Sequence, residues 1–390
     1  MSRRILIGVA MIALGLGLLL PDPRRAAAAS PAFSLPQHYY LSLGDSLAFG
    51  YQQFKVDAQL PNVHPATFNT GYTDDFAAML AVVRPDVQTE NYACPGEITS
   101  EFLSSPGCPS YPFPIHASYS GSQLDAAVAF LKAHPGQVNP ITVSMGSNDV
   151  ERVVQACGGF TPAGISCAVP KLPGVVSQAG VNLARIFATL RQAAPNAEII
   201  AVQPYNPVAV NPDLAATSNL VIQALDKAIA QGGAPAGVIL ADAFTPFDLA
   251  PNQPATLCRL TLMCTASPGI HASDGGYAVI AQQIWNVSGY NKLASLFVVG
   301  FDSSQPGQGK VYFGTGPGCA GLVQVGTMDI HPGTTTHAVV VTGNDLPGTI
   351  GNIGLPPGGT YWYETVTATS AGEQIDNSGG ACYSVTVPTG

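Results

Sequence analysis

The stretch Tyr40-Leu41-Ser42-Leu43-Gly44-Asp45-Ser46-Leu47-Ala48-Phe49-Gly50 decides the fold class of this chain. Residues 38–43 are mostly aromatic and aliphatic, as a buried central strand requires. Gly44 then ends the apolar run, and Ser46 follows where a strand usually turns into a loop or helix. Because α/β folds place ligands at the carboxyl edge of a parallel sheet, the Ser46 hydroxyl is a candidate nucleophile. A Gly-Asp-Ser triplet alone is weak support, so this role requires a base and an oxyanion site elsewhere in the chain.

Strands and helices alternate from residue 36 to about residue 290. Stretches with helical spacing, such as Leu124, Ala127, Val128 and Leu131, separate the candidate strands. This alternation predicts a doubly wound α/β fold, with a parallel sheet of about five strands and helices on both faces. The five candidate strands are Tyr39–Leu43, Val87–Tyr92, Ile141–Ser144, Glu198–Gln203 and Val238–Ala243.

The pattern changes after Leu296. Residues 296–309 are predicted to form a linker, because Ser303–Gly309 is rich in serine, glycine, glutamine and proline. Short β-like runs without helical spacing follow, so residues 310–390 are expected to form a small all-β sandwich. Within them, Leu355–Tyr363 resembles the turn and penultimate strand of fibronectin type III-like domains.

The first thirty residues have the pattern of an export signal. Arg3 and Arg4 supply positive charge, Ile5–Leu20 is an apolar run, and Ala26–Ala29 offers small residues for cleavage. An apolar run of this length is short for a membrane span, so we expect a secreted protein with no span after cleavage. A retained N-terminal anchor is the alternative.

The net charge of the chain limits which classes of molecule it is expected to bind. Without residues 1–30 the chain holds 11 basic and 23 acidic residues, a net charge of −12. Nucleic acid and anionic membrane surfaces repel so acidic a chain. The expected partners are therefore neutral small molecules, lipids or glycans.

Eight cysteines follow the export signal, and an even count outside the cytoplasm predicts disulfides. Eight cysteines allow 105 pairings. No Cys-x-x-Cys pair exists and no histidine has zinc-finger spacing, so a metal site is not expected. Clustering along the chain favours the sequential pairs Cys94–Cys108, Cys157–Cys167, Cys258–Cys264 and Cys319–Cys382.

Three more segments lie just after predicted strands or just before the last predicted helix: Asn91–Thr99, Met145–Asp149 and Ile270–Tyr277. Together with Gly44–Leu47 they resemble, in order, the conserved blocks of the GDSL or SGNH hydrolase family. The resemblance spans residues 38–287. It implies an SGNH-type hydrolase domain over residues 36–295, closest in character to the extracellular bacterial lipases and esterases.

The same resemblance implies a role for each block in ester hydrolysis through an acyl-enzyme. Ser46 attacks the carbonyl carbon, and His271 accepts its proton and later protonates the leaving alcohol. The backbone N–H groups of Ser46 and Gly96 and the side-chain amide of Asn148 hold the oxyanion. Glycine at 96 lets the backbone approach the substrate closely. No metal or cofactor is implied.

One position departs from the family pattern. The acid that usually stands three residues before the histidine is replaced here by Pro268. Some members of the family hold the histidine with a main-chain carbonyl at that position, and proline retains its carbonyl. We therefore expect a Ser46–His271 dyad oriented by the Pro268 carbonyl. Asp274 is the other candidate acid, although it suits a helix-capping role better.

These features predict a secreted serine carboxylic ester hydrolase, a lipase or esterase, that acts on esters of lipids or simple alcohols. The first alternative is an O-acetyl esterase for polysaccharides, with the C-terminal sandwich binding a glycan or the cell surface. The second is a catalytically dead hydrolase domain that serves as a binding or adhesion protein. Its only support is the missing acid at Pro268.

Overall fold

A computed structural model describes residues 33–250, 252–294, 296–325, 328–342 and 359–386 of the chain. The predicted export signal and the turn of the fibronectin-like stretch lie outside these ranges. Within the described ranges, no helix combines the length and the apolar character that crossing a membrane requires.

A five-stranded parallel sheet forms the centre of the N-terminal α/β part, in the order β2-β1-β3-β4-β5. This confirms the predicted doubly wound fold. In this strand order β1 lies between β2 and β3, and ligands bind where the direction of winding reverses, at the carboxyl ends of β1 and β3. All five predicted strands are present: β1 Tyr39–Gly44, β2 Gln88–Asn91, β3 Val138–Ser144, β4 Ile199–Gln203 and β5 Ile239–Asp242.

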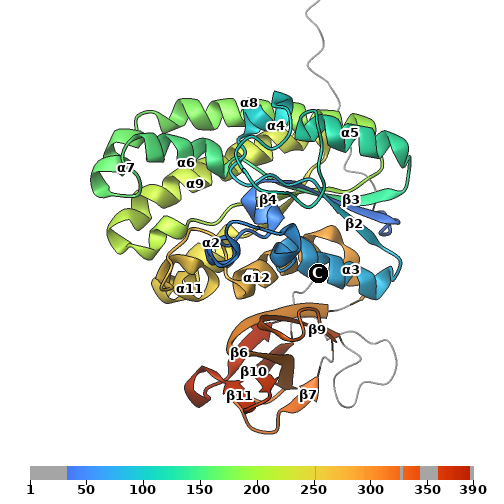
Figure 1. Ribbon diagram of the computed structural model, residues 1–390, viewed down its shortest axis with the longest axis vertical. Helices are drawn as coiled ribbons and strands as arrows, with labels where there is room; N and C mark the ends of the chain where they lie inside the picture. The colour runs from blue at the N-terminus through green and yellow to red at the C-terminus, as the bar shows by residue number, and fades with distance from the viewer. Residues whose placement is uncertain (1–32, 251, 295, 326–327, 343–358, 387–390) are drawn as a thin grey trace, which may run out of the picture.

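Helices cover both faces of this sheet (Figure 1). One face carries α3 and α12, and the other carries α5, α8 and α9, with a separate apolar core under each layer. Helix α5 begins at a capping box, in which the Ser122 hydroxyl accepts the Asp125 N–H at 3.1 Å. The longer helices are α3 Tyr72–Val83, α5 Gln123–Ala133, α6 Ser147–Ala156, α8 Leu172–Ala193, α9 Pro212–Gly233 and α12 Asp274–Ser288. The shorter helices are α1 Ser46–Phe49, α2 Gln53–Gln59, α4 Thr99–Ser104, α7 Pro162–Ala168, α10 Phe244–Asp248 and α11 Gln253–Leu260.

The C-terminal region is antiparallel and all-β. It starts directly with strand β6, Leu296–Gly314, so the predicted linker over 296–309 is wrong. Glycine and serine in this stretch suggested a loop, but β6 pairs through backbone groups with β9 and then with β10. Pro306 lies where the register shifts between Asp302 and Gly307, a position at which a strand tolerates proline. The other strands are β7 Val323–Val325, β8 Met328–Asp329, β9 Thr334–Thr342, β10 Thr360–Thr369, β11 Gly372–Asp376 and β12 Tyr383–Thr386.

These strands form one continuous sheet of seven, because β6 passes from the half that contains β9 into the half that contains β10. Side chains of both halves pack together, among them Phe297, Val339, Phe313 and Tyr361. The described strands are therefore not two independently hydrogen-bonded sheets. The fibronectin-like resemblance stays a prediction.

Alternate residues of β6 pack into two different hydrophobic cores. Phe297 and Val299 face the core of the β region, whereas Leu296 and Val298 join the core beneath α12. Because successive side chains of a strand point to opposite faces, one strand closes both cores. The C-terminal region is thus packed on the α12 side of the α/β part (Figure 1).

Four disulfides are present, and each joins the pair that clustering along the chain favoured. They are Cys94–Cys108, Cys157–Cys167, Cys258–Cys264 and Cys319–Cys382.

Candidate active site

Ser46 is the first residue of α1, immediately after β1. Gly44 ends the strand with φ of 137°, and a Cβ there would lie 2.2 Å from the Ser144 carbonyl oxygen, so only glycine fits. Asp45 caps α1 by accepting the Leu47 N–H at 3.0 Å. The Asp45 carboxylate is thus structural, and the Ser46 side chain, 9% exposed, lies at the carboxyl edge of the sheet.

The loop after β2 brings Gly96 to the same edge. Gly96 has φ of 80°, and its carbonyl accepts a hydrogen bond from the Arg152 guanidinium at 3.0 Å. The Cys94 N–H donates to the Gly44 carbonyl at 2.9 Å, which ties this loop to the end of β1. The backbone N–H groups of Ser46 and Gly96 donate to no other described residue, so both are available to a substrate oxygen.

Asn148 comes from the start of α6, just after β3. Gly146, with φ of 117°, makes the turn out of the strand. The Asn148 side chain is buried, and its Nδ2 donates one hydrogen to the Glu97 carbonyl at 3.0 Å. An amide nitrogen carries two hydrogens, so one remains for a second acceptor.

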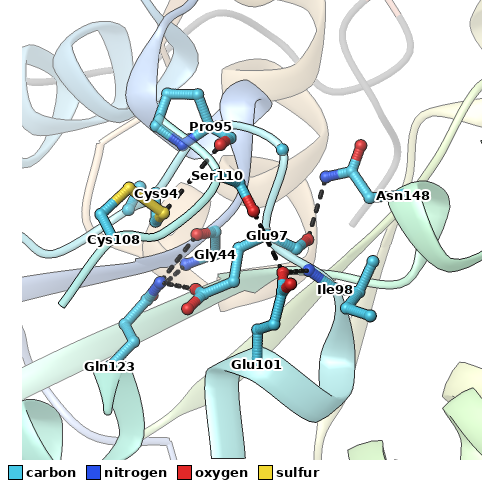
Figure 2. Close-up of a disulfide and its surroundings, with 12 residues drawn as sticks. Gly44, Cys94, Pro95, Glu97, Ile98, Glu101, Cys108, Ser110, Gln123 and Asn148 are labelled. Carbon is cyan, nitrogen blue, oxygen red and sulfur yellow. Dashed lines mark hydrogen bonds between the residues drawn. A yellow bond between two sulfur atoms is a disulfide. The ribbon is translucent and has the colours of Figure 1, made fainter. Parts of the chain in front are cut away.

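Two side chains that the sequence did not single out connect these segments. Figure 2 shows Gln123, from α5, reaching both Gly44 and Glu97, while Asn148 points to the Glu97 carbonyl. Glu97 and Gln123 are both completely buried. The one signal in the sequence is that Glu97 is the only charged residue in Asn91–Ser100, a segment that is otherwise apolar or neutral.

His271 lies on the loop before α12. Its carbonyl accepts the Leu262 N–H at 2.9 Å, which fixes the backbone, and its ring packs against the Tyr51 ring with centroids 4.7 Å apart. The Tyr51 N–H donates to the Ser46 carbonyl at 2.9 Å, so Tyr51 contacts both members of the predicted dyad. Burial lowers the pKa of His271 to about 4, which keeps the ring neutral at pH 7.

The hydrogen bonds predicted for His271 are not formed among the described residues: its ring bonds neither Ser46 Oγ nor the carbonyl of Pro268, which is an exposed residue. In unliganded enzymes such catalytic bonds are often long and tighten in the complex. The dyad and the carbonyl stay predictions. The helix cap expected of Asp274 is wrong, because Ser273 caps α12 by accepting the Gly276 N–H at 3.2 Å.

The Asp274 carboxylate has other partners. Oδ1 accepts from the Gln52 side chain at 3.1 Å and lies 3.8 Å from Lys55 Nζ. Asp149 is likewise structural, because it accepts the Thr99 N–H at 3.0 Å and the Thr99 hydroxyl at 2.7 Å.

An apolar pocket opens beside this edge. Its volume is about 80 Å³, between α6, α7, α8 and α9, which is smaller than most sites for drug-sized molecules, at roughly 300–1,000 Å³. Ser147, next to Asn148, and Ile270, next to His271, are among the residues that line it. Its walls are mainly aliphatic and include Val150, Val154, Ile165, Leu172, Val221 and Ile222.

Comparison with known proteins identifies one family. Residues 42–279 match the model of the GDSL-like lipase/acylhydrolase family, and this range contains all four sequence blocks. Among curated proteins, none matches the chain.

Several solved structures are similar. Phospholipase A1 from Streptomyces albidoflavus NA297 shares 15% identity, over 64% of this chain and 98% of its own, with a TM-score of 0.45. The extracellular lipase from Streptomyces rimosus is 17% identical, again over 64% of this chain and 98% of its own, with a TM-score of 0.41. A carbohydrate esterase family 2 enzyme with a carbohydrate binding domain, from Corynascus thermopiles, shares 14% identity over 66% of this chain and 68% of its own, with a TM-score of 0.38.

Proposed function

The chain belongs to the GDSL-like lipase/acylhydrolase family, and we propose that it is a secreted serine hydrolase of carboxylic esters. Ser46 Oγ bonds to the ester carbonyl carbon while His271 accepts its proton. The bond to the alcohol oxygen then breaks, and His271 protonates the leaving alcohol. Water repeats the sequence on the acyl-enzyme, which releases the acid and restores Ser46.

The observation that carries this proposal is a set of three donors in the segments after β1, β2 and β3 from which no described residue accepts a hydrogen bond. They are the N–H groups of Ser46 and Gly96 and the second amide hydrogen of Asn148. Fixed donors aimed at a developing oxyanion need no reorganisation during the reaction, and each is worth about 100- to 1000-fold in turnover.

Pro268 is proposed to orient His271 through its main-chain carbonyl once substrate is bound. Packing against Tyr51 limits the positions open to the His271 ring, and Asp274 is occupied by Gln52 and Lys55. These contacts favour a dyad over a triad completed by Asp274.

For the substrate, the proposal favours esters of fatty acyl chains over acetylated sugars. The aliphatic walls of the pocket suit a hydrocarbon chain, and its lining includes Ser147 and Ile270, the neighbours of Asn148 and His271. An acetyl group is too small to use such a pocket. Each buried methylene contributes about 0.8 kcal/mol, or about fourfold in kcat/KM.

Substrate preference tests this choice against the O-acetyl esterase alternative. We expect kcat/KM to rise from p-nitrophenyl acetate through butyrate to octanoate and to be low on acetylated xylan. Val221→Trp, which fills the pocket, should lower the octanoate-to-acetate ratio. Leu220→Trp, on the exposed neighbour of Val221, should leave that ratio unchanged. A preference for acetylated xylan would favour the alternative.

Labelling by a fluorophosphonate tests the reaction itself. The wild-type protein should be labelled, and Ser46→Ala should not. A folded wild-type protein that remains unlabelled would instead support a dead hydrolase domain with a binding role.

Export is proposed from the charged, apolar and small-residue segments of residues 1–30, and the four disulfides suit an oxidising compartment. Glycan or cell-surface binding by the C-terminal region remains a proposal. Binding of the intact protein to insoluble cell-wall polysaccharide would test it.

A further inference from the structure

The Gln123 side-chain amide bonds through its oxygen and through both of its hydrogens to Gly44 and Glu97. Its Oε1 accepts the Gly44 N–H at 2.6 Å, and its Nε2 donates to the Gly44 carbonyl at 2.9 Å and to the Glu97 carboxyl. Gly44 lies two residues before Ser46, and Glu97 directly follows Gly96. One side chain thus spans the nucleophile turn and the loop that supplies an oxyanion donor (Figure 2).

The loop that contains Glu97 is held on its other side by different contacts. Asn148 donates to the Glu97 carbonyl at 3.0 Å, and Arg152 donates to the Gly96 carbonyl at 3.0 Å. The Gly96 carbonyl, the Glu97 carbonyl and the Glu97 side chain are thus all held. These contacts restrict the backbone on the carboxyl side of Gly96, whose N–H donates to no other described residue.

From these contacts we propose that Gln123 and Glu97 form a positioning pair that keeps the Ser46 turn and the Gly96 N–H at a fixed separation. This inference rests on the proposed ester hydrolysis. Neither side chain is a catalytic residue, because each acts through the backbone of Gly44 or Gly96.

The charge of Glu97 matters to this role. Burial is the main cause that raises the pKa of Glu97 to about 9, against the lowering effect of the hydrogen bond with Gln123; Glu101 and Asp45 add to the rise, and Arg152 opposes it. Tyr119 also faces the carboxyl group. At neutral pH the pair is therefore an uncharged acid hydrogen-bonded to an amide.

Ionisation of Glu97 would disturb the site in two ways. The Oε1 atom is buried without a partner among the described residues, so a carboxylate there would be poorly solvated. Its negative charge would also lie near the developing oxyanion and oppose it. Activity should therefore fall as the pH rises through about 9.

Three variants test the positioning pair by steady-state kinetics between pH 6 and 10.5, with Ser46→Ala as the blank for spontaneous hydrolysis. Gln123→Ala should lower kcat about 100-fold with little change in KM, as expected for misplaced reacting groups. Glu97→Gln, a neutral acid mimic, should retain turnover at pH 7 and lose the alkaline decline. Glu97→Ala should lose turnover at every pH.

Glu198→Gln is the matched control, because Glu198 is also a buried glutamate with a raised pKa but precedes β4 at the opposite edge of the sheet. It should keep the wild-type pH profile. Circular dichroism melting of each variant separates misplacement from unfolding.

The proposal is overturned if folded Gln123→Ala keeps wild-type kcat, or if Glu97→Gln retains the alkaline decline. Fluorophosphonate labelling separates this failure from failure of the proposed function, since labelled wild-type protein preserves ester hydrolysis even when the pair proves dispensable.

Discussion

Asn148 performs two tasks with one amide group. One hydrogen fixes the Glu97 carbonyl, and the other is free for the substrate oxygen. Asn148→Ala should therefore lower kcat about 100- to 1000-fold, because it removes a hydrogen bond to the oxyanion that becomes stronger in the transition state. Steady-state kinetics on a p-nitrophenyl ester measure this.

Asn182→Ala provides the control for that substitution, since Asn182 is a buried asparagine that donates to Thr99 instead. It should keep most of the wild-type turnover. An Asn148→Ala variant with a raised KM but an unchanged kcat would contradict the oxyanion role.

His271 determines the acid limit of activity. A folded-state pKa lowered to about 4 means that the ring stays neutral, and able to accept a proton, down to about that pH. The profile of kcat/KM against pH should hence fall near pH 4, well below the ordinary histidine pKa of about 6.5. A decline centred at pH 6 to 7 would show that the base is solvated during catalysis.

Sequence patterns found the residues of the candidate site that lie directly after strands. Ser46, Gly96 and Asn148 meet at one edge because β1, β2 and β3 are adjacent, which strand–helix alternation already predicts. Glu97 and Gln123 were missed because their role depends on a contact between the start of α5 and two separate loops. No local pattern encodes a contact across 79 residues.

At the scale of elements, the N-terminus of α12 supplies a test of the dyad. Asp274 pairs with Lys55 at 3.8 Å, and both side chains are almost completely buried. Asp274→Ala should keep turnover at pH 7 but lower the free energy of unfolding by about 3 kcal/mol, because it removes a buried carboxylate that pairs with the buried Lys55 ammonium. Urea unfolding and kcat, measured on the same preparation, report the two quantities.

Loss of turnover in Asp274→Ala with unchanged unfolding would be the opposite result. Asp274 would then be the acid that orients His271, and the role proposed for the Pro268 carbonyl would fail.

The strands of the parallel sheet were predictable because buried strands form short apolar runs bounded by turn residues. Strand β6 was not predictable in full, although the sequence shows that it begins with an apolar run. Its second half contains Ser303–Gly309, whose composition is typical of a linker, yet backbone pairing with β9 and β10 does not depend on side-chain type. Tertiary pairing therefore overrides local composition here.

At the scale of the whole molecule, the shared core predicts cooperative unfolding. Val298 and Ala338 from the C-terminal region belong to the core that also contains residues of α3 and α12. Calorimetry on the intact protein should show a single transition. Phe313→Ala, in the core of the β region, should shift that whole transition, with a cost of about 3–5 kcal/mol. Two separate unfolding transitions, only one of which shifts in Phe313→Ala, would contradict cooperative unfolding.

The two-sided packing of β6 also bears on when the chain becomes active. A chain that is synthesised and exported from its N-terminus presents Ser46 early and His271 much later, but the apolar face of α12 is covered only once β6 and β9 have followed. Since α12 begins just after His271, the base segment settles late in maturation. If the protein is exported as proposed, the base segment would therefore be fully packed only after β6 and β9 had also crossed the membrane.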